Sequence, residues 1–232
     1  MTRETFYRLK ELYSGTIDKK EINYIDGKGQ KEEIIIPKSA KNSELIGIIL
    51  GDGYLQSKSQ VREKRTLSSH RLVITLNKNE LKLRQRVIEL LNNIGKEPKI
   101  HHLKSSEAIQ IVVYSIELVD KLVELGLETG NKVKNQVGVP KWLKNNEEYS
   151  RACLRGLIDT DGTIYRQNID GRLIIQFKNH SLQLIQDFKT MCSLLDIETS
   201  SGGKKVIQVA RQPEVKKAIK KIKPIKSEDI SF

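Results

Sequence analysis

The sequence predicts an α+β protein made of two tandem copies of one structural unit, and two matched pairs of segments indicate this. Arg71–Asn77 resembles Arg172–Lys178, and both runs are apolar and rich in β-branched residues, as strands are. Upstream of them, Leu45–Gly53 matches Leu154–Gly162. Matched segments in the same order indicate a duplicated unit.

The remaining elements repeat in the same order. After each matched strand, apolar residues recur every three or four positions, which predicts a helix with one core-facing side. The two sets share one constant offset: Leu83, Val87, Leu90, Leu91 and Ile94 in the first copy, and Leu184, Phe188, Met191, Cys192 and Leu195 in the second. Cys192 is therefore expected to be a small buried apolar residue.

A third matched pair completes each copy. Ala108–Ser115 and Lys205–Gln212 favour strands, and the helical stretches Ile116–Leu125 and Pro213–Ile222 follow them. Each unit is thus predicted to run helix, strand, strand, helix, strand, strand, helix.

These patterns divide the chain into four parts. Residues 42–127 form the first unit and 146–232 the second, while 128–145 form a linker marked by glycines and a proline. Residues 1–41 are an N-terminal extension of unknown role. In it, Thr5–Tyr13 is predicted to be helical and Ile34–Ile36 strand-like.

Composition narrows the possible functions. The chain has 232 residues with a formal net charge of +12, which points to a polyanionic partner such as nucleic acid. No apolar run approaches the roughly 18 residues of a membrane span, and the charged N-terminus does not resemble a secretory signal. Two cysteines are too few for a disulfide framework or a structural zinc site.

The first helix of each unit ends in Asp-Gly, at Asp52-Gly53 and Asp161-Gly162. Asn42 or Ser43 is expected to cap the first of these helices, and the glycines are expected to supply left-handed C-caps. An aspartate in the last turn opposes the helix dipole. Its occurrence at both equivalent positions indicates that something cationic lies there.

Small residues recur on these two helices. Gly47 and Gly51 share one face of the first helix, and Gly156 and Thr160 match them in the second. Small residues at this spacing let two helices approach closely. Asp52 and Asp161 would then lie together and either share a proton or bind a metal, with Mg²⁺ or Mn²⁺ favoured by oxygen ligands. A carboxylate–metal pair beneath a basic surface suits phosphodiester hydrolysis.

At these motifs the sequence resembles the LAGLIDADG homing endonucleases in their monomeric two-motif form. Leu154–Gly162 matches the nine-letter pattern except at positions two and seven, and Leu45–Gly53 is a looser copy. Gly130–Asn135 and Val139–Trp142 are also similar to this family. The resemblance covers about residues 42–226. It implies two αββαββα units with the motif helices packed at the centre and two four-stranded antiparallel sheets forming a DNA-binding saddle.

The resemblance also implies a chemistry. Asp52 and Asp161 would bind divalent metal, with Mg²⁺ expected and Mn²⁺ or Ca²⁺ able to occupy the same sites. Each would serve cleavage of one DNA strand at a long asymmetric target, leaving 3′ overhangs. Lys178 matches a basic active-site position of the family, and Lys134 is a second candidate. The sixth motif position is Asp159 in one copy and Leu50 in the other, so Asp159 is not assigned to catalysis.

The predicted strands and loops carry side chains of the kinds that read base edges or contact phosphates. The expected DNA contacts in unit one are Lys58, Arg62, Lys64, Arg65, His70, Arg71, His101, Lys104 and Gln110. Those in unit two are Arg166, Gln167, Asn168, Arg172, Lys204, Gln208 and Arg211.

The leading hypothesis is a monomeric, intron-encoded, site-specific endonuclease that promotes intron mobility by cutting double-stranded DNA. Because the chain begins at Met1 and lacks splicing residues at its ends, a free-standing protein is expected rather than an intein. We expect it in the cytoplasm near the nucleoid, or in an organelle, with no membrane or protein partner. Two alternatives stay open: an RNA maturase that assists splicing, and a catalytically silent DNA-binding regulator on the same fold.

Overall fold

A computed structural model describes residues 34–57, 70–103, 106–167, 171–228 and 230. The described residues all belong to one compact unit of the chain, 34–232. The helix predicted at Thr5–Tyr13 lies outside the described residues.

The first half of this unit follows the predicted order of elements. Its four strands form one antiparallel sheet in the order β1-β2-β4-β3. The elements are α3 (Ala40–Asp52), β1 (Gly53–Gln56), β2 (Arg71–Asn77), α4 (Leu81–Asn93), β3 (Lys99–His102), β4 (Ala108–Tyr114) and α5 (Ile116–Glu124).

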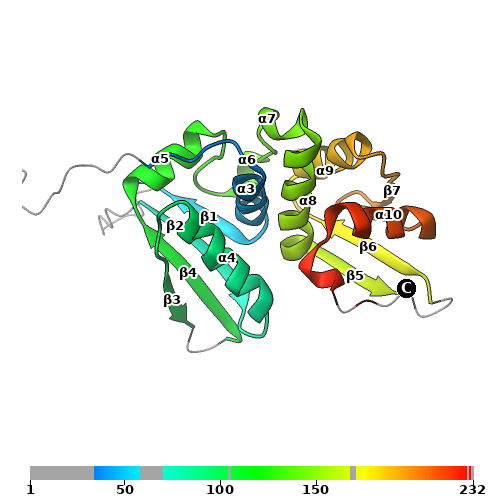
Figure 1. Cartoon of the computed structure of the whole chain (residues 1–232), viewed down its shortest axis with the longest axis horizontal. Helices are drawn as coiled ribbons and strands as arrows, with labels where there is room; N and C mark the ends of the chain where they lie inside the picture. The colour runs from blue at the N-terminus through cyan, green and yellow to red at the C-terminus, as the bar shows by residue number, and fades with distance from the viewer. Residues whose placement is uncertain (1–33, 58–69, 104–105, 168–170, 229, 231–232) are drawn as a thin grey trace, which may run out of the picture. The chain divides into compact units, whose positions relative to one another are not determined.

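The second half repeats this topology, with strand order β5-β6-β8-β7. Its elements are α8 (Glu147–Asp161), β5 (Gly162–Arg166), β6 (Leu173–Lys178), α9 (Leu182–Leu194), β7 (Ser200–Gly203), β8 (Val206–Val209) and α10 (Gln212–Ile222). A 3₁₀ turn, η1 (Ile225–Ser227), follows α10. The predicted α+β fold class is confirmed: α3 and α8 lie side by side between the two sheets (Figure 1).

The helix α3 ends at Asp52 as predicted, but its start differs from the prediction. The helix begins earlier, because Ser39 caps it and its hydroxyl accepts a hydrogen bond from the Asn42 amide at 3.3 Å. Neither Asn42 nor Ser43 is the cap; both are buried within the first turns. The cap of α8 is Asn146, whose side chain accepts a hydrogen bond from the Tyr149 amide at 3.0 Å.

The glycines after these helices are not left-handed. Gly53 and Gly162 have φ of −87° and −88°, in extended backbone that leads directly into β1 and β5. Space rather than conformation requires glycine here. A Cβ at Gly53 would lie 2.5 Å from the Ile49 Cα, and one at Gly162 would lie 2.6 Å from the Ile158 Cα.

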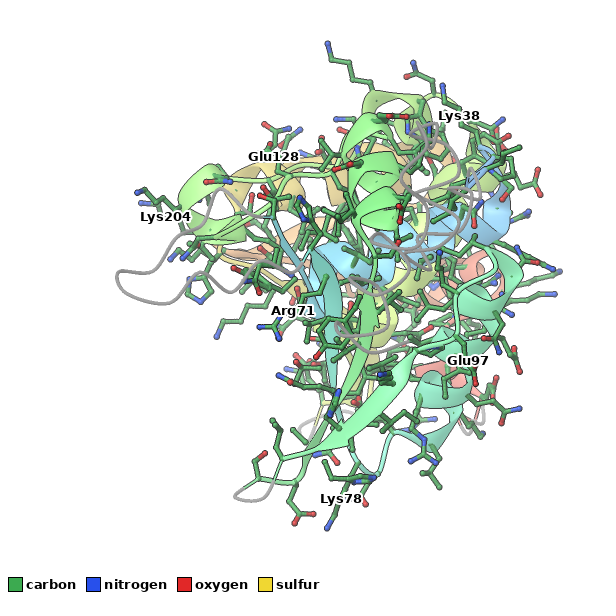
Figure 2. All side chains as sticks on the ribbon, turned by 90° about the vertical axis from the view of Figure 1, so that its left-hand side faces the viewer. Lys38, Arg71, Lys78, Glu97, Glu128 and Lys204 are labelled. Atoms are coloured by element: carbon green, nitrogen blue, oxygen red, sulfur yellow. The ribbon has the colours of Figure 1, made fainter. Side chains whose placement is uncertain are left out.

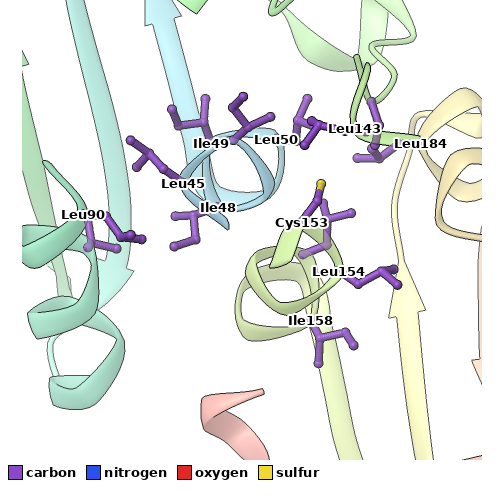
Figure 3. Close-up of a cluster of buried hydrophobic side chains, with 14 of the residues drawn as sticks. Leu45, Ile48, Ile49, Leu50, Leu90, Leu143, Cys153, Leu154, Ile158 and Leu184 are labelled. Carbon is purple, nitrogen blue, oxygen red and sulfur yellow. The ribbon is translucent and has the colours of Figure 1, made fainter. Parts of the chain in front are cut away.

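One continuous apolar core joins the two halves through the central helices. Leu45 and Ile48 of α3 point toward Leu90 of α4, while Leu154 of α8 points toward the second half (Figure 3). Cys192 is fully buried, as predicted. Ile34 and Ile36 form no strand, contrary to expectation, but both side chains are buried in this core.

The segment expected to be a linker contains two short helices, α6 (Lys132–Asn135) and α7 (Lys141–Lys144). The buried carboxylate of Asp187 in α9 holds it. This carboxylate accepts hydrogen bonds from the backbone amide of Val139 at 2.7 Å, the ammonium of Lys144 at 2.6 Å and the side-chain amide of Gln183 at 3.0 Å. Within the described part of the chain, no helix has the length and apolar character needed to cross a membrane.

Candidate active site

The two motif helices touch along the small residues singled out from the sequence. A Cβ added to Gly47 would lie 2.3 Å from the Cys153 carbonyl oxygen, and one added to Gly156 would lie 2.4 Å from the Glu44 carbonyl oxygen. Nearer the site, a Cβ at Gly51 would lie 2.0 Å from the Thr160 hydroxyl oxygen. The helix backbones are therefore as close as their atoms allow, and the two helices end together.

This packing brings Asp52 and Asp161 into electrostatic contact. Burial and the neighbouring Asp161 carboxylate raise the pKa of Asp52 from 3.8 to about 6. Burial also raises the pKa of Asp161. Two half-buried acids that share one small region favour either a proton or a bound cation between them.

Two lysines occupy the carboxyl ends of the motif helices. The Lys132 ammonium of α6 donates hydrogen bonds to the carbonyls of Leu50 at 2.9 Å and Ile49 at 3.3 Å, and also to that of Gly51. The Lys226 ammonium of η1 donates to the carbonyls of Thr160 at 2.9 Å and Gly162 at 2.7 Å.

These lysines supply the positive charge that the sequence indicated at the helix ends, because the last carbonyls of a helix carry partial negative charge. Both lysines also act against the rise in the pKa of the two aspartates. Burial lowers the pKa of Lys132, and the two carboxylates act against that shift. A matched lysine follows the last helix of each unit, after α5 and after α10. This placement of a lysine after the last helix of each unit is a signal that the sequence contains.

Of the two lysines predicted for the site, Lys178 is adjacent to Asp161 in the strand register, and Lys134 is on the short helix α6. Lys134 is exposed on α6, and the side chain of that helix nearest the carboxylates is Lys132. Lys178 is exposed at the end of β6. It directly follows Phe177, the residue paired with Gly162, so it lies next to Asp161 in the sheet register.

The two halves of the site are not equivalent. Gly53 pairs with Ile74, whereas Gly162 pairs with Phe177, which is two residues further along the matched strand. Lys178 consequently has no counterpart beside Asp52, where Thr75 follows the paired residue. Lys78, further along, is ion-paired with Glu107 at 2.5 Å and lies at the end of β2 remote from Arg71 (Figure 2).

Different neighbours also surround the two aspartates. Asn179 donates a hydrogen bond to the Asp161 carboxylate at 2.7 Å. Glu80, which precedes α4, is close enough to Asp52 to raise its pKa further. Among the described residues, no group of three or more His, Cys, Asp and Glu could hold a metal ion.

A row of polar side chains crosses each sheet on the face turned away from the core. In the first sheet His101 pairs with Gln110, which pairs with Thr75. In the second sheet Gln208 pairs with Gln176 and with Ser200. The two glutamines predicted to contact DNA thus hold matching places, and alternating polar residues on a sheet suit the major groove.

The other predicted DNA contacts are distributed along the same sheets. Arg71 donates a hydrogen bond to the Gln56 side chain at 2.7 Å, and Arg211 is ion-paired with Glu198. His70, Arg166, Gln167, Arg172 and Lys204 lie at strand ends and turns. Lys58, Arg62, Lys64, Arg65, Lys104 and Asn168 lie outside the described residues.

Comparison with known proteins identifies this architecture. Residues 148–206 match a family model described as a LAGLIDADG-like domain. The chain is 32% identical over 214 residues to the replication factor C small subunit of Methanocaldococcus jannaschii. That match covers 82% of this chain but 11% of the relative's length.

Two kinds of solved structure share the fold. One is the homing endonuclease I-DmoI in complex with DNA and Mn, with 20% identity, a TM-score of 0.51 and coverage of 82% of this chain and 98% of that chain. The other is full-length DUF199/WhiA from Thermatoga maritima, with 17% identity, a TM-score of 0.52 and coverage of 82% and 58%. The chain therefore carries a LAGLIDADG-like domain in its second half, and its two halves together have the LAGLIDADG fold.

Proposed function

We propose that the chain is a site-specific endonuclease that hydrolyses both strands of a DNA duplex with divalent metal. The observation that carries this proposal is the meeting of Asp52 and Asp161 at the ends of two close-packed helices. A protein that only bound DNA would gain nothing from two neighbouring carboxylates beneath a phosphate backbone, since they repel it.

The residues present fit a divalent cation. Burial and repulsion from Asp161 raise the pKa of Asp52, and a cation bound between the carboxylates would relieve that repulsion. Mg²⁺ is commonly held by one or two carboxylates, with water and phosphate oxygens as its other ligands. A metal bound there would lower the pKa of a bound water molecule and would stabilise negative charge on the scissile phosphate. The I-DmoI structure determined with Mn supports divalent metal at this type of site.

The protein's own groups would perform the other tasks. Lys132 and Lys226 are held at the helix ends with their ammonium groups close to both carboxylates. From there they would attract the phosphate and offset the charge that develops on it. The polar rows across the two sheets, which contain Gln110 and Gln208, would contact base edges in the major groove. The net charge of +12 would provide a salt-dependent attraction to the duplex.

A DNA-binding protein without nuclease activity is the second candidate, because the fold that this chain shares with both I-DmoI and DUF199/WhiA does not by itself imply cleavage. The carboxylate pair and its two lysines support the nuclease instead. An RNA maturase would use the same excess of positive charge.

The biological setting is also part of the proposal. Cleavage of an unoccupied target would promote the spread of the DNA that encodes the chain, as in intron homing. The matching stretch makes up 11% of a replication factor chain, so a module carried inside a longer host protein fits as well as one encoded in an intron.

A plasmid assay separates these candidates. Supercoiled plasmid would carry the flanks of the host gene joined without the insertion, and would be incubated with protein in Mg²⁺ or in EDTA. The nuclease predicts one Mg²⁺-dependent double-strand cut with 3′ overhangs and no cut in plasmid with scrambled flanks. Tight binding without a cut in either Mg²⁺ or Mn²⁺ would leave the regulator, and protein-dependent splicing of the RNA would establish the maturase.

A further inference from the structure

Asp159, the sixth residue of the second motif, is a buried acid that lies apart from the pair of aspartates. Its side chain is only 1% exposed, and its Oδ1 accepts a hydrogen bond from the backbone amide of Lys226 at 3.1 Å. The carboxylate thus does not lie at the helix end with Asp161. It faces the turn η1, which follows the last helix of the unit.

The residue that Asp159 holds is the one that delivers a lysine to the site. Two parts of Lys226 are held at the end of α8. Its backbone amide donates to Asp159, and its ammonium donates to the carbonyls of Thr160 and of Gly162, which directly follows the helix. Displacement of the turn would therefore move the ammonium away from the end of α8.

The other contacts of this C-terminal segment act elsewhere. Arg155 donates to the Ile222 carbonyl at 2.9 Å, at the end of α10, and Lys82 pairs with Glu228 at 2.9 Å on the surface. Ser227 closes the turn on itself through the Pro224 carbonyl at 2.7 Å. Among these contacts, only that of Asp159 is made to Lys226 itself.

In the first unit, other contacts hold the segment that carries the matching lysine. Its lysine, Lys132, lies on α6, which Asn131 caps by accepting from the Lys134 amide at 2.9 Å. The preceding residue is tied to β1, since the Gly130 amide donates to the Leu55 carbonyl at 3.0 Å. No acid is needed on α3, and the equivalent motif position is the buried Leu50.

We propose that Asp159 is a positioning residue of the second half-site, which holds the backbone turn that brings Lys226 to the cleavage centre. This proposal rests on the proposed nuclease function for its consequence in catalysis, but the hydrogen bond that it assigns can be tested without DNA. It also accounts for the difference between the two motifs at their sixth position.

The first test measures hydrogen exchange of the Lys226 amide by NMR in the full chain. In Asp159→Leu this amide is expected to lose about tenfold or more of its protection, because its acceptor is gone. Asp159→Asn keeps an oxygen acceptor and is expected to keep protection within about threefold of the wild type. Unchanged protection in the leucine variant, or equal loss in both variants, would overturn the proposal.

The second test is a double-mutant cycle in the plasmid assay. Asp159→Leu is expected to slow the strand cut served by the Asp161 half-site about tenfold, so that nicked circles accumulate. In a Lys226→Met background the same change is expected to have less than about a twofold effect, since both residues act through one ammonium. A full tenfold loss in that background would show that Asp159 acts through something other than Lys226.

Glu228→Gln is the matched control. It removes a surface ion pair of the same segment, whose partners are 58% and 54% exposed, and is expected to change neither protection nor cleavage. If the wild-type chain cuts no DNA, the proposed function fails, while amide exchange still decides whether Asp159 holds the turn.

Discussion

Gly156→Ala probes the contact between the motif helices. The added Cβ would lie 2.4 Å from the Glu44 carbonyl oxygen, 2.7 Å from the Ile48 amide nitrogen and 3.0 Å from the Gly47 carbonyl carbon. All three are backbone atoms of α3, so no side chain can rotate away and the helices must separate by about 1 Å. Overpacking typically costs 1–3 kcal/mol, and an obstacle made of backbone places this substitution at the upper end, about 3 kcal/mol, while alanine returns about 1 kcal/mol of helix propensity. We expect a net loss of about 2 kcal/mol.

Urea denaturation followed by circular dichroism measures this loss. Gly51→Ala is the matched comparison, because the obstacle there is the Thr160 side chain rather than backbone. Combining it with Thr160→Gly removes the obstacle, and this pair is expected to recover most of the stability that Gly51→Ala loses. A Gly156→Ala protein as stable as the wild type would refute the close approach of the helices.

Three further predictions concern buried charge. Glu44 is 2% exposed and pairs with Arg86 at 2.8 Å and Arg155 at 3.2 Å, so Glu44→Ala should cost about 3 kcal/mol in urea denaturation, and a loss below about 1 kcal/mol would contradict this. Asp187→Ala should lower the free energy of unfolding by a similar amount, and by more than Lys144→Ala does, because it also leaves the backbone amide of Val139 without its acceptor. Equal losses in the two variants would argue against this role of Asp187. The pKa of Asp52 is raised to about 6, so the folded protein binds more protons than the unfolded chain between pH 3.8 and 6 and loses stability as pH rises through that window. In EDTA, Asp52→Asn should therefore stabilise the protein at pH 8, by about 1–2 kcal/mol after solvent screening, and far less at pH 4; an equal effect at both pH values would contradict the shift.

The topology could be predicted because it repeats. Two helix stripes with one constant offset, and matched strands before and after them, leave few alternatives for the order of elements. The small residues at 47, 51, 156 and 160 indicated the helix pair for a physical reason, since only small side chains permit such contact.

Details that depend on tertiary contacts could not be predicted in the same way. Local propensity at Asn42 and Ser43 favours a cap, but the core extends the helix back to Ser39. Glycine at 53 and 162 is needed for space rather than for a left-handed turn.

The site shows the same limit. Lys132 and Lys134 differ by two positions on a one-turn helix, and the packing of α6 decides which of them faces the carboxylates. The strand register of β1 on β2 differs by two residues from that of β5 on β6, and no local sequence pattern indicates this difference.

The most direct test of the central claim compares strand-resolved cleavage and binding in the wild type, Asp52→Asn and Asp161→Asn, on plasmid with the joined flanks. The account predicts that either substitution abolishes the Mg²⁺-dependent double-strand cut while specific DNA binding persists, since removing an acid beneath the backbone does not weaken attraction to phosphate. A double-strand cut at the wild-type rate in either variant would contradict it.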